Sequence, residues 1–87
     1  MQRTKIESTN IASVGYDDAT QMLEIEFKPG KSGLAAIWEY TPVHRSVYEA
    51  MLDPAQSPGR IFHAQIKSNP EICAEHKDDI VPEAVAS

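Results

Sequence analysis

The stretch MLEIEFK, residues 22–28, alternates apolar and charged side chains. A period of two places the apolar side chains on one face of a β-strand and the charged ones on the other, so this stretch predicts a strand with one wet face. Two further runs that favour strands flank it, at residues 11–16 and 34–41. Because the three runs follow one another with only short turns between them, the sequence predicts a three-stranded antiparallel meander.

The apolar period changes from two to 3.6 after Pro42, which predicts a helix that ends at Asp53, before a proline. A second helix is expected over residues 57–68, with Ser57 as its N-cap and Pro58 in the first helical position. A short third helix is a further expectation over residues 70–80. The predicted fold class is therefore α+β, a three-stranded antiparallel meander followed by two helices, with a short third helix near the C-terminus.

Length and composition limit the classes of protein. With 87 residues, 41% of them hydrophobic and 24% charged, the chain holds one globular domain. Its longest apolar run, residues 34–38, is far shorter than the ~18–20 residues of a membrane span. The polar N-terminus and the single cysteine favour a cytoplasmic location, in a bacterium or in the host cell of a phage. The small size leaves self-association open.

The acidic charge is unevenly distributed along the chain. The formal net charge is -5, which argues against a protein that coats long DNA. Residues 70–87 carry five acids and one base, whereas residues 1–69 carry eight acids and seven bases. Residues 57–69 contain Arg60 and Lys67 and no acid. The net charge therefore comes mostly from the C-terminal part, and it leaves room for an anion site on a nearly neutral body.

Two groups of residues are candidates for ligand binding. Trp38 and Tyr40 share one face of the third predicted strand, where they would either stack on a planar ligand or pack under the helices. The start of the second predicted helix would either bind phosphate or be a plain cap on a solvated helix. The candidate residues for phosphate are Ser57, Gly59, Arg60, His63 and Lys67, joined by Arg45 at the start of the first helix. Arg60, His63 and Lys67 would share one helical face.

The order of several short motifs resembles the KTSC domain, a small domain named for the C-terminus of some lysyl-tRNA synthetases. The motifs are Gly15-Tyr16-Asp17, Leu23-x-Ile25-x-Phe27, Trp38-Glu39-Tyr40, Val43 with Tyr48, and Ser57-Pro58-Gly59-Arg60-x-Phe62-x-x-x-Ile66-Lys67. The resemblance covers about residues 8–69. It departs at Trp38-Glu39-Tyr40, where the family has Tyr-x-Tyr, in a longer loop before this motif at residues 29–36, and at His63. It implies a single KTSC-like domain over residues 1–69, followed by an acidic tail or short helix over 70–87. The family has no assigned activity, although RNA binding has been suggested for it.

We expect a non-enzymatic binding domain, because no phosphate loop or nucleophile-elbow motif occurs. A metal site and a cofactor are not expected, since Cys73-x-x-His76 offers only two ligands. The first functional hypothesis is binding of a phosphate-bearing ligand: a nucleotide, such as a cyclic nucleotide signal, or a short RNA. The alternative is an acidic protein-interaction module, such as a phage or bacterial accessory or inhibitor protein that docks on a larger assembly.

Overall fold

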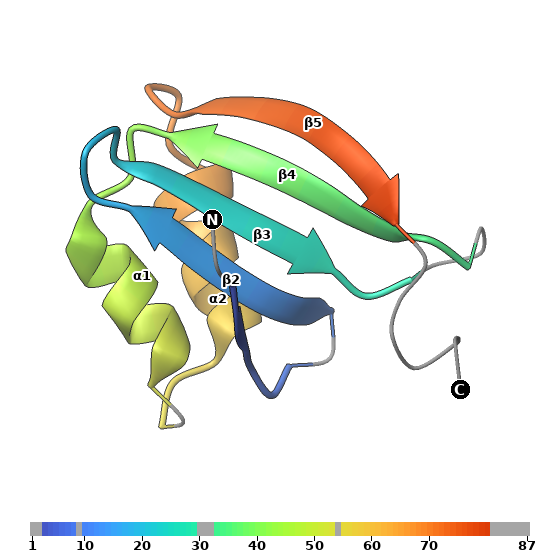
Figure 1. The fold of residues 1–87 in the computed structure, drawn as a ribbon. Coiled ribbons are helices and arrows are strands. Elements are labelled where there is room, and N and C mark those ends of the chain that lie inside the picture. Colours follow the sequence, from blue (N-terminus) through green and yellow to red (C-terminus); the bar gives the residue numbers. More distant parts are fainter. Residues whose placement is uncertain (1–2, 9, 30–32, 54, 81–87) are drawn as a thin grey trace.

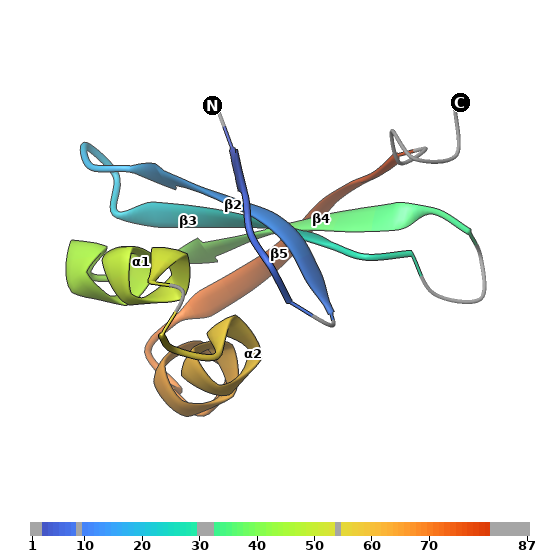
Figure 2. The same cartoon turned by 90° about the horizontal axis from the view of Figure 1, so that it is seen from below.

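A computed structural model describes residues 3–8, 10–29, 33–53 and 55–80 of the protein. Five antiparallel strands form one sheet in the order β1-β2-β3-β4-β5, and short helices cover one of its faces (Figures 1 and 2). The strands are β1 (Thr4–Lys5), β2 (Ile11–Asp17), β3 (Met22–Phe27), β4 (Ala35–Thr41) and β5 (Cys73–Ile80). The helical elements are α1 (Arg45–Leu52), α2 (Pro58–Ile61) and a π-helical segment, η1 (Phe62–Lys67), which continues α2.

The central strands β2, β3 and β4 lie where the hydrophobic alternation predicts them. Leu23 and Ile25 of β3 are completely buried on the helix-covered face, opposite Tyr40 and Trp38 of β4. The turn from β2 to β3 closes where Asp17 Oδ1 accepts a hydrogen bond from the backbone N–H of Ala19 at 3.0 Å. Such a local side-chain bond is the reason why Asp favours turns.

The prediction of a three-stranded sheet is wrong, because a strand is added at each edge. β1 pairs with the middle of β2, placing Thr4 opposite Val14. β5 pairs along the whole of β4, from Cys73 opposite Thr41 to Ile80 opposite Ala35. The described part of the chain is thus mostly sheet, with two short helices and one π-helical segment.

The predicted third helix over residues 70–80 is also wrong, since this part of the chain contains β5. Residues 73–79 are all exposed, so no apolar period marks them as a strand. Pairing with β4 satisfies the backbone hydrogen-bonding groups on one side of this edge strand, and only the tertiary structure supplies that partner. Asn69 begins a turn rather than a helix, because its Oδ1 accepts the backbone N–H of Glu71 at 2.9 Å. The remainder of the predicted acidic tail, residues 81–87, lies outside the described residues.

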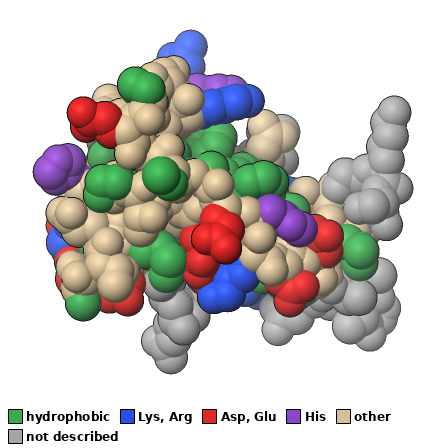
Figure 3. All heavy atoms as spheres, turned by 90° about the horizontal axis from the view of Figure 1, so that it is seen from above, with side chains coloured by type: hydrophobic (Ala, Val, Ile, Leu, Met, Phe, Trp, Pro, Cys, Tyr) green, Lys and Arg blue, Asp and Glu red, His purple; other side chains and the backbone are tan. Residues whose placement is uncertain are grey.

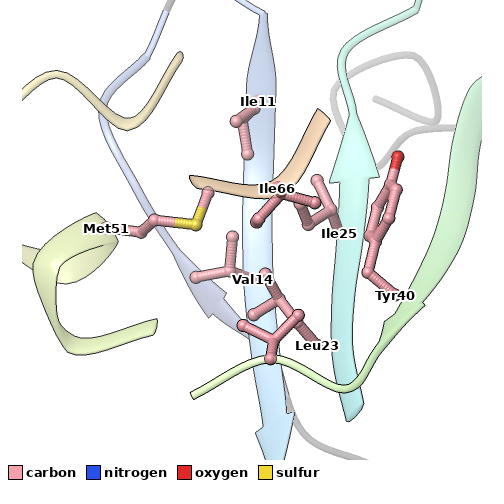
Figure 4. Close-up of a cluster of buried hydrophobic side chains, with 8 residues drawn as sticks. Ile11, Val14, Leu23, Ile25, Tyr40, Met51 and Ile66 are labelled. Atoms are coloured by element: carbon pink, nitrogen blue, oxygen red, sulfur yellow. The ribbon is translucent and has the colours of Figure 1, made fainter. Parts of the chain in front are cut away.

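The hydrophobic core lies between the helices and the covered face of the sheet (Figure 4). Figure 4 shows side chains of the sheet, among them Leu23 and Ile25, converging with Met51 of α1 and Ile66 of η1. The buried cluster consists of Ile11, Val14, Leu23, Ile25, Tyr40, Val43, Met51 and Ile66. Val43 precedes α1 and accepts a hydrogen bond at its carbonyl from the Tyr16 hydroxyl, while Tyr16 stacks on Tyr48 at 5.4 Å between ring centroids. These contacts seat α1 against β2.

The open face of the sheet carries a cluster of charged and polar side chains that extends from Arg3, just before β1, across β2, β3 and β4 to β5, and we call it the open-face ion cluster. It consists of Arg3, Ser13, Glu24, Glu26, Glu39 and Lys77. Glu24 is buried although its strand face was predicted to be wet, because Arg3 contacts one carboxylate oxygen and Lys77 lies 3.7 Å from the other. Lys77 also donates a hydrogen bond to Glu39 at 2.9 Å. The two cations therefore tie the sequence ends of the described chain to the central strand.

Candidate functional site

An aromatic groove of about 450 Å³ lies between the sheet and the π-helical segment. We define it by its lining residues Phe27, Trp38, Tyr40, Phe62, Ile66, Lys67, Asn69, Ile72 and Ala74. Figure 3 views the molecule from the β5 side, where hydrophobic side chains gather between the helical elements and β5. A largely apolar concave site with a few polar groups at its rim is the usual form of a small-ligand pocket.

The rings of the aromatic groove form a continuous series. Trp38 and Tyr40 are nearly parallel, with centroids 6.5 Å apart and an interplanar angle of 20°. Phe62 meets Tyr40 edge-on at 5.4 Å and meets Phe27 in the same way, also at 5.4 Å. On β5, His76 lies opposite Trp38, with ring centroids 5.1 Å apart. The faces and edges of these rings support one another in the geometries that aromatic pairs prefer.

Tyr40 and Trp38 differ in burial, which decides whether each side chain belongs to the core or is accessible to a ligand. Tyr40 belongs to the buried core, and burial raises its pKa to about 12. Trp38 is only half-buried and packs at the edge of the core. Within the described part of the chain, neither the Tyr40 hydroxyl nor the Trp38 indole N–H has a hydrogen-bond partner. Trp38 therefore exposes part of a ring to the groove, and both residues bring a polar tip.

A second, more polar pocket of about 820 Å³ lies on the other flank of the same helical segment, and we call it the polar pocket. It contains the predicted candidates Ser57, Gly59, Arg60 and His63. The loop before β2 lines it with Glu7, Ser8 and Asn10. Ser57 precedes α2 without making a side-chain cap hydrogen bond, and α2 has only four residues. The helix start therefore has no side-chain cap, and the anion site expected there stays a prediction that would depend on the basic groups Arg60 and His63.

The structure divides the sequence candidates among three places. Trp38, Tyr40 and Lys67 line the aromatic groove, and four others line the polar pocket. Arg45 lies in neither pocket, since it is exposed and pairs with Asp18 and, at 3.2 Å, with Glu49. Asp18 raises the pKa of Arg45 through a direct hydrogen bond. Arg45 is thus engaged in surface ion pairs.

The π-helical segment explains why Lys67 is separated from Arg60 and His63. A spacing of i, i+3 and i+7 shares one face only in a regular α-helix. In η1 the backbone hydrogen bonds run over five residues, so each residue turns less about the axis and the later residues leave the original face. Lys67 consequently lies beside Phe62 and Ile66 in the groove. The sequence contains no regular signal for this change of period.

Phe62, Phe27 and Asn69 line the groove, although no sequence pattern predicts them as site residues. The alternation of residues 22–28 marks Phe27 only as an apolar residue of its strand. Ile72 and Ala74 come from the segment predicted to be helical. The proximity of these residues depends on β5 pairing with β4, and no short motif reports that pairing.

The geometry first defines a class: a small α+β domain with an antiparallel sheet, helices on one face, and an aromatic groove at their junction. The family model of the KTSC domain matches residues 7–69, and the chain belongs to this family. The crystal structure of a KTSC domain protein from Yersinia pestis is similar with a TM-score of 0.70 and 30% sequence identity. That likeness covers 88% of this chain and 97% of the other.

A bacterial relative supports the same assignment. A protein of Stutzerimonas stutzeri strain A1501 is 37% identical over 67 residues, which cover 77% of this chain and 86% of the relative. Trp38, Tyr40, Phe62 and Lys67 lie within the residues matched by the family model, whereas Arg3 and Lys77 of the open-face ion cluster lie outside them. Family membership supports the fold of the core and assigns no ligand.

None of the described helices has the length and apolar character to cross a membrane. Among the residues that the structure describes, no three side chains of His, Cys, Asp or Glu are grouped so that they could hold a metal ion.

Proposed function

We propose that this KTSC domain is a binding module for a phosphate-bearing ligand with a planar base, a nucleotide or a short RNA, and that the base occupies the aromatic groove. The observation that carries the proposal is the half-buried Trp38 ring, nearly parallel to Tyr40 in a groove of about 450 Å³. Stacking of a base on an aromatic side chain contributes about 1–3 kcal/mol and tolerates any base. The volume lies within the range of small-ligand pockets.

The rim of the groove supplies groups that suit a nucleotide. Lys67 is exposed and forms no ion pair with any described residue, in contrast to Arg3, Arg45 and Lys77. An unpaired ammonium is available to a phosphate without first losing a protein partner. Asn69 uses Oδ1 to accept the Glu71 N–H, which directs its amide NH₂ group away from that turn. A base or sugar oxygen is a suitable acceptor for this donor.

Fluorescence of Trp38 provides the direct test, because it is the single tryptophan of the chain. We expect adenosine monophosphate to quench or shift the emission in a saturable manner, and to raise the melting temperature in step with its concentration. Adenosine and inorganic phosphate, titrated separately, should bind more weakly than the nucleotide, because each offers only one part of the site. The absence of any spectral or thermal response to nucleotides and short RNAs would rule the proposal out.

Two charge variants make the test specific. Lys67→Gln removes the ammonium at the groove, whereas Arg45→Gln removes a positive charge of equal size outside both pockets. We expect Lys67→Gln to weaken nucleotide binding and Arg45→Gln to leave it unchanged. Equal weakening by both variants would show that only the overall charge matters.

A second candidate function rests on β5, whose residues 73–79 are exposed along the edge of the sheet. Extended segments of other proteins can add to such an edge, and Glu75, Asp78 and Asp79 would favour a basic segment. Deletion of residues 70–87 would remove this strand and part of the groove, so it is not a clean test. The double variant Asp78→Asn/Asp79→Asn keeps the strand, and a lysine-rich peptide that binds both forms equally would contradict this candidate.

A further inference from the structure

We infer that the ligand is a single-stranded oligonucleotide rather than a mononucleotide, and that it crosses the segment Pro58–Lys67 from the aromatic groove to the polar pocket. The inference rests on the proposed function and adds the class of ligand and a second binding position. The two pockets lie on opposite flanks of one helical segment and draw on different residues of it. A ligand that fills only one pocket would leave the other flank unused.

The first observation is the junction between Phe62 and His63. Phe62 lines the groove and His63 lines the polar pocket, and their rings meet edge to face with centroids 5.8 Å apart. Residues 63–65 are exposed, so the surface that joins the two pockets is open to a ligand. An α-helix with its side chains is about 10–12 Å in diameter, so a strand that passes over it needs more than one nucleotide.

The second observation is the state of the positive charges. Arg60 in the polar pocket and Lys67 in the groove pair with no carboxylate of the described residues, and residues 57–69 contain no acid. Of the other basic residues, Arg3, Arg45 and Lys77 are held in ion pairs, whereas Lys28 pairs with no described carboxylate and lines neither pocket. Unpaired cations are therefore placed on both flanks of the segment that the strand would cross. Two separated cations match successive phosphates of one strand, whereas a single phosphate can contact only one of them.

Glu7 is the acidic group that faces this path, because it lines the polar pocket together with Arg60 and His63. Its carboxylate opposes a phosphate bound there. It therefore provides a variant with an effect of opposite sign: Glu7→Gln should strengthen binding of an oligonucleotide while leaving a mononucleotide in the groove unaffected.

The test compares adenosine monophosphate with an adenylate tetranucleotide, the latter both as RNA and as DNA of the same sequence, by Trp38 fluorescence at fixed salt. We expect the tetranucleotide, in at least one of its two forms, to bind about tenfold more tightly than the mononucleotide, a gain equivalent to one good additional contact. The double variant Arg60→Gln/His63→Gln should lose that gain and keep the affinity for the mononucleotide. For this double variant, the slope of log affinity for the tetranucleotide against log salt should be smaller in magnitude by about one, because one phosphate contact is lost.

The outcomes separate the inference from the function on which it rests. If the mononucleotide binds and neither tetranucleotide binds more tightly, or if the Arg60→Gln/His63→Gln variant keeps the full gain, the second position is wrong and the groove remains. If no nucleotide of any length binds, the proposed function fails as well. Arg60 and His63 are exposed, so the variant should melt at the temperature of the parent protein, and Glu7→Gln provides an independent result in the opposite direction.

Discussion

The two faces of the same sheet are held together by different interactions. On the covered face, Leu23 and Ile25 are completely buried among apolar side chains that come from strands and helices. On the open face, the alternate residue Glu24 is almost as well buried, but Arg3 and Lys77 enclose it. One strand therefore contributes an apolar core on one side and an ion cluster on the other. The difference shows that burial by itself does not distinguish a hydrophobic environment from a charged one.

The comparison also bears on function. The covered face ends in the aromatic groove, where Trp38 and Lys67 remain accessible to a ligand. On the open face the cations are already paired with Glu24 and Glu39. Trp38 and Lys67 thus place accessible aromatic surface beside an unpaired cation on the helical side of the described molecule. The following predictions test the contrast between the two faces, from the largest expected effect to the smallest.

The largest effect is expected from the covered face. Leu23→Ala should lower the free energy of unfolding by about 2–5 kcal/mol, because it removes buried apolar atoms and leaves a cavity in the core. Urea denaturation measures the change. Leu34→Ala is the matched control, since Leu34 is 39% exposed and should cost less than about 1 kcal/mol. Similar losses for the two leucines would contradict the assignment of the core.

A smaller effect is expected from the open face. Glu24→Gln should cost about 1–3 kcal/mol, because it leaves Arg3 and Lys77 without the carboxylate that bridges them. The loss should be smaller than for Leu23→Ala because both cations can turn toward water. Glu49→Gln, at an exposed pair with Arg45, serves as the control and should not change the urea midpoint measurably. If Glu24→Gln and Glu49→Gln change the urea midpoint by the same amount, the burial of Glu24 contributes nothing to stability.

The pH dependence of stability tests the burial of Tyr40 on the covered face. Burial raises the pKa of Tyr40 to about 12, above its ordinary value of about 10. Between these values the folded state holds a proton that the unfolded state has released, so stability present below pH 10 should fall as the pH rises toward 12. Burial, with Asp18, also raises the pKa of Tyr16. In urea melts at pH 9 and pH 11, Tyr40→Phe should therefore reduce this alkaline loss without abolishing it, and an unchanged loss would contradict the prediction.

The smallest effect is expected at Arg45, which belongs to neither face. Its partners Asp18 and Glu49 are exposed, and water and salt screen such pairs. Arg45→Gln should leave both the thermal midpoint and nucleotide affinity unchanged. A loss of nucleotide binding in this variant would show that Arg45 belongs to the ligand site, and would contradict its position outside both pockets.

The local pattern of the chain predicted much of the central sheet and little of its edges. The alternation of residues 22–28 and the apolar side chains of residues 11–16 and 34–41 correspond to β3, β2 and β4. The segments β1 and β5 have no buried alternation, because both lie at edges and their residues are mostly exposed. Their pairing is a tertiary interaction between residues distant in the chain, and a single sequence does not report it.

The candidate site was predicted as a set of residue types rather than as a place. The aromatic side chains at residues 38 and 40 and the basic residues at 60 and 67 were identified, and the aromatic groove contains three of these four. Helical spacing predicted one basic face, but the π-helical segment divides it between two pockets. The buried carboxylate of Glu24 was interpreted as solvated, since the covering cations come from residues 3 and 77.

The sequence by itself determined the alternation that makes β3 the centre of the sheet, the family to which the chain belongs, and the absence of acids between residues 57 and 69. These features depend on neighbouring residues and their order. The tertiary structure alone decided that β5 closes the groove, that Glu24 is enclosed by two cations, and that Arg60 and Lys67 lie on different flanks. The first two depend on contacts between distant segments, where backbone pairing and burial outweigh local propensity. The third depends on the π-helical turn of η1, which no regular sequence pattern marks.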